Sequence, residues 1–283
     1  MKLKNVLFNN LKNINHKWLG KNFSTHLRKN PYWFFRDVNF DYKNGSRYKS
    51  FDLKRDKENK RVELIPYKED YKSVLVWLYA GDLIDYCVYQ LLEYNNFPTK
   101  AMKIVILSAP FNPITYHTAV LEHNWFNILD LPDSEGNRYI NKREINKYMK
   151  EMIFQEINHQ YTLIGDYKNI FIGGFSQSAC MALHSGLSYK ENLGGIISFS
   201  GFKFDFSPID LEKKKIPILA CNGQNDDIVI VRQVKESFQP LINLDFNLKL
   251  VLENGLHHAF SKTSLQYASE FLKESLKEEK IDF

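Results

Sequence analysis

Hydrophobic positions follow two different spacings along most of this chain. Short, almost wholly apolar runs such as Ile216–Cys221 are typical of strands buried on both faces of a sheet. Between them lie longer segments with apolar residues every three to four positions, such as the face of Leu265, Ala268 and Leu272, which is typical of amphipathic helices. The pattern predicts strands near residues 73–79, 103–109, 169–173, 194–200, 216–221 and 247–252, and helices near 83–95, 143–160, 176–188, 228–242 and 262–279.

This alternation predicts an α/β fold, with a mainly parallel sheet that carries helices on both faces. We expect residues 62–283 to form one domain around one core. Cys87, Cys180 and Cys221 stand in apolar sequence at unpaired spacings, so we expect reduced core thiols in an intracellular protein. The sequence has no apolar run approaching a membrane span. It also has no histidine and cysteine cluster that predicts a metal, and we expect no cofactor.

The positive charge of the chain is concentrated at its N-terminal end. Residues 1–36 contain eight basic side chains and no acidic one, and removing these eight from the total of 38 leaves 30 basic against 33 acidic residues. Apolar residues recur at helical spacing from Leu3 to Trp18. A basic, acid-free, amphipathic segment resembles a mitochondrial transit peptide; the alternative is a disordered basic tail on a cytoplasmic protein. Nothing resembles a nucleic-acid reading module, so nucleic acid is not an expected partner.

A connector of aromatic and charged residues is expected at 37–61. It follows the aromatic run Pro31–Phe35, which is too apolar for a free linker and is expected to pack on the domain or on a partner. It ends in a charge run from Lys54 to Arg61 that we expect to be solvated. The chain is therefore expected to consist of a basic arm, this connector and the 62–283 domain.

The most specific local motif is GGFSQS at Gly173–Ser178, directly after the apolar run Ile170–Ile172. A buried strand that turns sharply into a helix with a serine at the apex is the nucleophile elbow of α/β-hydrolases, with the usual signature G-x-S-x-G. Ser176 is then the candidate nucleophile, and Ser178 stands where the signature has its last glycine. The alternative is a Gly-Gly turn followed by a helix N-cap serine.

An acid and a base follow the next strands, in the chain order Ser, Asp, His of this fold. Asp226 and Asp227 lie in a polar loop after one predicted strand, and His257 and His258 follow another. The carboxyl ends of parallel strands meet at one edge of a sheet, so three strands would bring these groups together there. Each pair taken alone is explained as ordinary loop residues, whereas the joint pattern favours a triad.

These motifs resemble the acyl-protein thioesterase family, also called the phospholipase/carboxylesterase family of α/β-hydrolases. The elbow matches the family's GGFSQ. Upstream, Ala109–Thr115 resembles AP-x-x-P-[VI]-T and Trp125–Ile128 resembles WFD-I. Downstream, Asn222–Val229 resembles HG-x-x-D-x-x-V and Gly255–His258 resembles G-x-x-H. This alignment implies that the acid is Asp226 and that the base is the second histidine of its pair.

Carried onto this chain, the resemblance implies a mechanism and a substrate class. His258 would take the proton of Ser176, which attacks an acyl carbonyl, while the acid holds the imidazole in place. The implied substrates are acylated proteins or lipid esters: fatty thioesters on protein cysteines, lysophospholipids or simple carboxyl esters. Phe111, Trp125 and Phe126 are candidates for lining an apolar acyl channel, with plain core packing as the alternative.

The loop that supplies half of the oxyanion hole departs from the family pattern. The family reads LHGLGD, whereas this chain keeps Gly81-Asp82 and has Leu78-Tyr79 in place of the His-Gly pair. The resemblance implies that the backbone N–H groups of Ala80 and Gln177 are the oxyanion donors. Losing one such donor typically costs about 10²–10³ in turnover.

A second hypothesis places the chain in a different functional class. The altered oxyanion loop, the lost elbow glycine and the basic aromatic arm fit a hydrolase fold with weak or no catalysis. Such a chain would be a structural subunit of a mitochondrial assembly that it contacts through residues 1–60. A binding module with a dead acyl site is a third reading, which the sequence does not separate from the second. The preserved order of Ser, Asp and His favours the enzyme.

Overall fold

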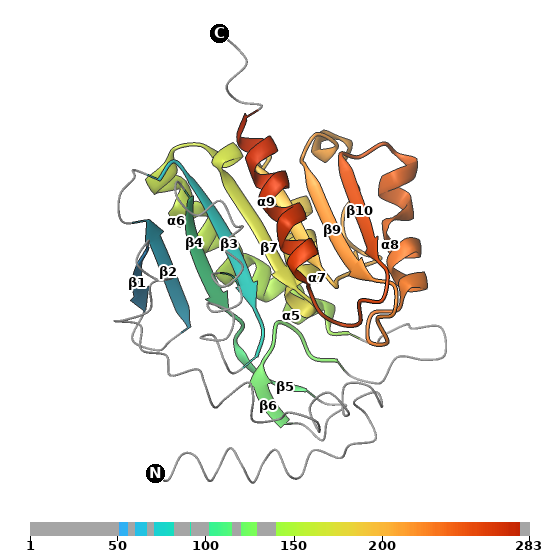
Figure 1. Ribbon diagram of the computed structural model, residues 1–283. Coiled ribbons are helices and arrows are strands. Elements are labelled where there is room, and N and C mark those ends of the chain that lie inside the picture. Colours follow the sequence, from blue (N-terminus) through green and yellow to red (C-terminus); the bar gives the residue numbers. More distant parts are fainter. Residues whose placement is uncertain are drawn as a thin grey trace. The chain divides into compact units, whose positions relative to one another are not determined.

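An eight-stranded sheet forms the centre of the part of the chain that the computed structural model describes, residues 51–55, 60–66, 71–81, 91, 102–114, 120–128 and 140–277 (Figure 1). Its strand order is β1-β2-β4-β3-β7-β8-β9-β10. The strands from β4 onward in this order pair in parallel, while β1 and β2 are antiparallel to their neighbours. The bounds are β1 Phe51–Arg55, β2 Arg61–Pro66, β3 Ser73–Tyr79, β4 Met102–Ser108, β7 Ile170–Phe175, β8 Gly195–Phe199, β9 Ile218–Gly223 and β10 Leu248–Glu253.

The six parallel strands are the six that the hydrophobic pattern predicts, each within two residues, so this prediction is confirmed. Their apolar side chains form two cores, one on each face of the sheet. Along β3, for example, Val74, Val76 and Leu78 belong to one core, and Leu75 and Trp77 to the other. A strand buried on both faces must be apolar at every position, which is why these runs show no alternation.

Helices cover both faces, as the strand and helix alternation predicts. The buried residues of α5, α6, α7 and α8 contribute to one core and those of α9 to the opposite core. The predicted helix near 143–160 is divided by a π-helical turn, and the predicted helix near 83–95 lies, apart from Leu91, outside the described residues. The bounds are α5 Lys142–Tyr148, η3 Met149–Ile153, α6 Phe154–Ile164, η4 Tyr167–Asn169, α7 Gln177–Ser188, η5 Leu211–Lys213, α8 Val231–Asn243 and α9 Lys262–Lys277.

The sheet extends further toward the N-terminus than the sequence analysis expects. Residues 51–55, assigned there to the connector, form β1 and pair with β2, and they fall within the compact unit Ser46–Phe283. In β2, buried residues alternate with partly exposed ones, and the charged residues Arg61 and Glu63 at two of the partly exposed positions concealed this short strand, which pairs with β1 and β4. The basic arm 1–36 lies outside the described residues.

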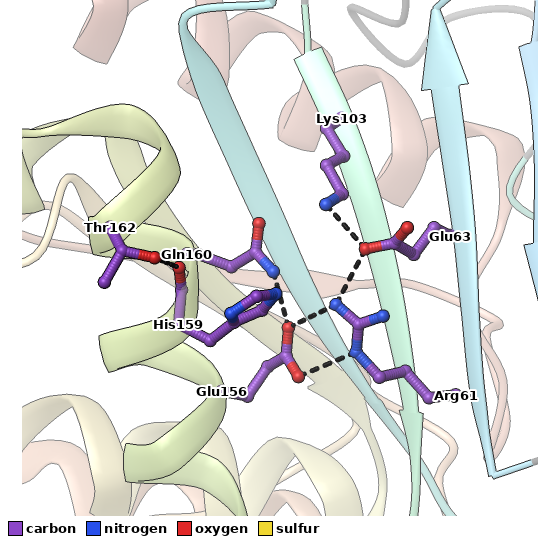
Figure 2. A network of polar contacts seen from close by, with 7 residues as sticks. All are labelled: Arg61, Glu63, Lys103, Glu156, His159, Gln160 and Thr162. Carbon is purple, nitrogen blue, oxygen red and sulfur yellow. Dashed lines mark hydrogen bonds and ion pairs between the residues drawn. The ribbon is translucent and has the colours of Figure 1, made fainter. Parts of the chain in front are cut away.

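A cluster of four charged side chains and one amide joins β2 and β4 to α6, and we call it the Arg61 clamp: Arg61, Glu63, Lys103, Glu156 and Gln160 (Figure 2). The Arg61 guanidinium binds both carboxylate oxygens of Glu156, at 2.8 and 2.9 Å, and it also contacts Glu63 at 2.7 Å. Lys103 Nζ lies 2.6 Å from Glu63 Oε1, the same oxygen that Arg61 contacts. The charge run that the sequence analysis treats as solvated therefore ends in a residue that pairs inside the fold.

A separate hairpin of β5 (Phe111–Ile114) and β6 (Val120–His123) precedes the segment that carries Trp125. The sequence analysis predicts neither strand. None of the helices in the described ranges is long and apolar enough to cross a membrane. The predicted fold class, an α/β-hydrolase fold with a mainly parallel sheet between helices, matches this architecture.

Candidate active site

Ser176 stands at the sharp turn between β7 and α7. Its backbone has φ 56° and ψ −122°, a conformation that costs on the order of 1–3 kcal/mol for a residue with a side chain. Its N–H donates to Phe199 O at 2.8 Å. A Cβ on Gly174 would lie 2.7 Å from the carbonyl carbon of Ser178 and 2.8 Å from its Cβ. The sharp turn expected from GGFSQS is present, and it requires glycine two residues before the serine.

Ser178 stands in place of the last glycine of the signature. It is accommodated because Gly174 has no Cβ to meet it and because its hydroxyl makes a hydrogen bond. Ser178 is buried, and its Oγ accepts a hydrogen bond from Trp125 Nε1 at 3.0 Å. A buried donor left without an acceptor costs about 1–3 kcal/mol. Ser178 therefore satisfies an indole N–H that a glycine would leave without this acceptor.

Asp226 lies in the loop after β9 and is held from two sides. Its Oδ1 accepts hydrogen bonds from Ile228 N at 2.9 Å and Val229 N at 2.8 Å, and its Oδ2 lies 2.9 Å from His258 Nδ1. The side chain is fully buried. Two backbone donors fix one oxygen, so the other oxygen is directed at the imidazole.

The loops that carry the acid and the base are joined to each other by their backbones. Asn225 N donates to Leu256 O at 3.0 Å, and Gln224 N donates to Glu253 O at 2.9 Å. A Cβ on Gly223 would lie 2.1 Å from Leu256 O, so a side chain there would force the two loops apart. Adjacent parallel strands thus deliver the acid and the base as one connected unit.

His258 completes a hydrogen-bonded chain from Asp226 to Ser176. Its Nε2 lies 2.8 Å from Ser176 Oγ, its ring packs 5.0 Å from that of Phe175, and 15% of its side chain is exposed. An ionised carboxylate can only accept a hydrogen bond, so Nδ1 carries the proton and Nε2 is free to accept the serine O–H. This arrangement can activate a serine for attack on a carbonyl carbon.

The structure also separates the members of each candidate pair. Asp227 and His257 are exposed to solvent, whereas their neighbours form the buried hydrogen-bonded chain. Among the residues that are described, no group of three or more His, Cys, Asp or Glu side chains is placed to hold a metal ion.

The two backbone groups assigned to the oxyanion hole have no acceptor among the described residues. Gln177 is the first residue of α7, and N–H groups of a first helical turn lack intrahelical partners. Ala80 follows β3, and none of the described residues accepts a hydrogen bond from its N–H. Leu78 and Tyr79, which replace the family's His-Gly pair, belong to β3, so the loop begins only at Ala80. The role of the Ala80 and Gln177 N–H groups as oxyanion donors remains a prediction.

The three aromatic residues assigned to an acyl channel have different surroundings. Trp125 and Phe126 are buried, at 0% and 3% exposure, whereas Phe111 is 55% exposed and lies against His123. Phe126 packs on Phe204 with ring centroids 5.4 Å apart. Core packing thus accounts for the two buried rings, and contact of any of the three with an acyl chain remains a prediction.

Two side chains that support this edge of the sheet escaped the sequence analysis. The Gln177 side chain accepts a hydrogen bond from Trp125 N at 2.7 Å and donates one to Phe126 O at 2.8 Å. His123 Nδ1 lies 2.8 Å from Ala109 O, and His123 O accepts from Gly81 N at 2.8 Å. The position of His123 near the WF motif was the only signal available in the sequence.

Comparison with known proteins gives consistent matches. A sequence profile of the Phospholipase/Carboxylesterase family matches residues 87–276. Carboxylesterase SOBER1 of Arabidopsis thaliana is 30% identical over 174 residues, which cover 60% of this chain and 75% of that protein. Acyl-protein thioesterase 1 of Neurospora crassa is 28% identical over 182 residues, which cover 62% of this chain and 74% of that protein.

The crystal structure of SOBER1 has the same fold, with a TM-score of 0.63 at 24% sequence identity over 72% of this chain and 99% of that chain. The family profile covers more than half of the chain, including the elbow and the loops of Asp226 and His258. The predictions of family, fold class and enzyme class made from the sequence are confirmed. This chain belongs to the phospholipase/carboxylesterase family of α/β-hydrolases.

Proposed function

We propose that this protein is a serine hydrolase that cleaves acyl thioesters or carboxyl esters through an acyl-enzyme formed on Ser176. The observation that carries the proposal is the hydrogen-bonded chain from Asp226 through His258 to Ser176, with contacts of 2.9 and 2.8 Å. The serine lies on a strained turn at the edge of the sheet where this fold places its active sites.

The proposed mechanism uses these residues in sequence. His258 Nε2 accepts the hydroxyl proton as Ser176 Oγ attacks the carbonyl carbon, and the imidazolium then gives this proton to the departing thiol or alcohol. Asp226 stabilises the imidazolium and preserves its orientation. The N–H groups of Ala80 and Gln177 bind the oxygen that becomes negative in the tetrahedral intermediate. Water, deprotonated by the same histidine, then releases the acid and restores the serine.

The substrate class rests on the relatives. SOBER1 is named a carboxylesterase and the Neurospora crassa relative an acyl-protein thioesterase, which supports acylated proteins or lipid esters as substrates here. Both ester types share the acyl carbonyl on which the proposed mechanism acts. The choice between them is made by comparing turnover of a palmitoylated cysteine peptide with that of its serine oxygen ester.

The proposed function is tested by labelling the purified full chain with a fluorophosphonate probe. Such a probe reacts with an activated serine whatever the natural substrate, and we expect labelling of the wild type and none of Ser176→Ala. Ester turnover in the variant should fall by about 10³-fold or more. Labelling that persists in Ser176→Ala would exclude this serine, and a folded wild type that does not label would favour the structural-subunit hypothesis.

A mitochondrial location and contact with a mitochondrial assembly through residues 1–60 are separate proposals. They are supported by the basic, acid-free composition of residues 1–36. Fusion of this segment to a fluorescent protein should direct the fusion to mitochondria, and a fusion with the basic residues changed to glutamine should stay outside. Equal distribution of the two fusions would exclude a targeting role.

A further inference from the structure

We propose that the short segment His123–Phe126 is a brace that fixes the distance between the two oxyanion donors, with the side chains of His123 and Gln177 as its positioning residues. The proposal rests on the proposed function for its catalytic meaning, although the contacts themselves do not depend on it. It goes beyond the triad because neither side chain takes part in the proton transfers.

The brace is attached at one end to the helix that carries the nucleophile. Gln177 supplies one oxyanion donor with its backbone N–H, and its side-chain amide binds Trp125 N at 2.7 Å and Phe126 O at 2.8 Å. These two bonds use both ends of the amide and leave one orientation that satisfies both partners. The Trp125 indole adds a third bond, 3.0 Å to Ser178 Oγ on the same helix.

The other end of the brace is attached to the loop that carries the second donor. His123 O accepts a hydrogen bond from Gly81 N at 2.8 Å, one residue after Ala80. Gly81 has φ +125°, a conformation that other residues rarely adopt. The hydrogen bond to His123 O therefore fixes the loop at Gly81, the residue whose backbone can adopt the most conformations. A path of hydrogen bonds thus connects the Gln177 amide to the neighbour of Ala80.

The His123 imidazole fixes this end of the brace to the sheet. Its Nδ1 lies 2.8 Å from Ala109 O, at the residue that follows β4, and a carbonyl acceptor requires that Nδ1 carries the proton. Ala109 N in turn donates to Tyr79 O at 2.8 Å, at the end of β3. The Phe111 ring lies 5.2 Å from the imidazole. In this chain Leu78 and Tyr79 belong to β3, and these contacts hold the loop that begins at Ala80.

If the brace positions the oxyanion donors, breaking it should weaken binding of the transition state and leave binding of the substrate nearly unchanged. Gln177→Leu keeps the backbone N–H and most of the volume but removes both side-chain bonds, and His123→Phe keeps the ring but removes the bond to Ala109. We expect kcat to fall about 10²-fold in the first variant and about tenfold in the second, with KM nearly unchanged, because an oxyanion donor acts only on the developing charge. His123→Asn, whose Nδ2–H can replace Nδ1–H, should recover most of the activity.

Two measurements and one control variant separate a positioning role from a general structural one. The inhibition constant of a trifluoromethyl ketone, which forms a tetrahedral adduct on serine, should rise by the same factor as kcat/KM falls. The acid limb of the pH–rate profile should not move, because His258 keeps its partners. Asn192→Ala removes two side-chain bonds far from the brace, to Glu212 O and from Lys213 Nζ, and should change neither quantity.

The brace itself is measured by amide hydrogen exchange in the full chain. Gly81 and Trp125 should lose protection in both His123→Phe and Gln177→Leu, while the amides of α8 keep theirs. If protection is unchanged, or if the losses of activity appear in KM alone, the proposal is wrong. If protection falls but the wild type shows neither turnover nor fluorophosphonate labelling, the brace stands and the proposed function fails.

Discussion

Two buried polar clusters of this molecule have similar contact distances but different charge balance. At the carboxyl edge of the sheet, fully buried Asp226 binds a histidine that keeps 15% of its side chain exposed beside the strained Ser176. In the Arg61 clamp, the side chains of Lys103 and Glu156 are 2% and 8% exposed, and each carboxylate meets a cation. Burial of charge therefore does not by itself mark a site, whereas a partly exposed base beside a strained nucleophile does.

In the Arg61 clamp, the neighbouring opposite charges outweigh the effect of burial on the pKa values of Arg61 and Glu63. Burial alone would lower the pKa of Arg61, but the hydrogen bond and charge of Glu156, with the charge of Glu63, raise it. Burial alone would raise the pKa of Glu63, but the hydrogen bond from Lys103 and the charges of Arg61 and Lys103 lower it. Both shifts favour the charged form, so Arg61 and Glu63 stabilise each other as ions.

The largest expected effect is on the reactive cluster. In Asp226→Asn, the amide oxygen must stay with the N–H groups of Ile228 and Val229, which need an acceptor. The amide NH₂ then faces His258 Nδ1, and the imidazole must place its proton on Nε2, where it cannot accept the serine proton. We expect kcat to fall by about 10³–10⁴ with little change in thermal stability, measured by ester hydrolysis and calorimetry.

The matched control for this variant is Asp227→Asn, one residue along the same loop and exposed to solvent. It removes the same charge without touching the hydrogen-bonded chain, so turnover should stay within twofold of wild type. A loss of less than tenfold in Asp226→Asn, or equal losses in the two variants, would mean that the acid has no orienting role.

The clamp should respond in the opposite way, through stability and not through turnover. Arg61→Met removes the cation that binds both oxygens of Glu156 and leaves two carboxylates partly buried. Because 25% of the Arg61 side chain is exposed, we expect a loss of about 2–3 kcal/mol in the free energy of unfolding, less than the roughly 3–5 kcal/mol typical of breaking a fully buried pair. Denaturant unfolding measures it, and kcat per folded molecule should be unchanged.

An exposed ion pair in the same molecule provides the comparison for Arg61→Met. Arg232 and Glu236 lie 2.8 Å apart on α8, with 61% and 62% of their side chains exposed. Glu236→Gln should cost less than about 0.5 kcal/mol, because solvent screens such pairs. Equal losses in the two variants would show that burial adds nothing to the clamp.

The two clusters also differ in how far the sequence predicts them. Ser176, Asp226 and His258 each follow a buried strand, and the topology of a parallel sheet brings strand ends together, so their proximity follows from local patterns. Arg61 and Glu156 are 95 residues apart, on strand β2 and on helix α6. No local pattern records that contact. His123 and the Gln177 side chain were missed for the same reason, because they act through bonds to backbone atoms of distant residues.

An effect smaller than that of Arg61→Met is expected on the acid stability of the clamp. The pKa of Glu63 is lowered below its ordinary value of 4.5 in the folded protein, so the folded state binds fewer protons than the unfolded chain as the pH falls. The contribution of Glu63 to stability is complete above pH 4.5 and is lost as the pH falls through its folded-state pKa. Denaturant unfolding of wild type and Glu63→Gln between pH 7 and pH 3 should therefore show the stability difference shrinking on acidification, by less than the effect of Arg61→Met. Parallel stability curves would show that the carboxylate gains nothing from Lys103 and Arg61, and the clamp would then rest on the Arg61–Glu156 pair alone.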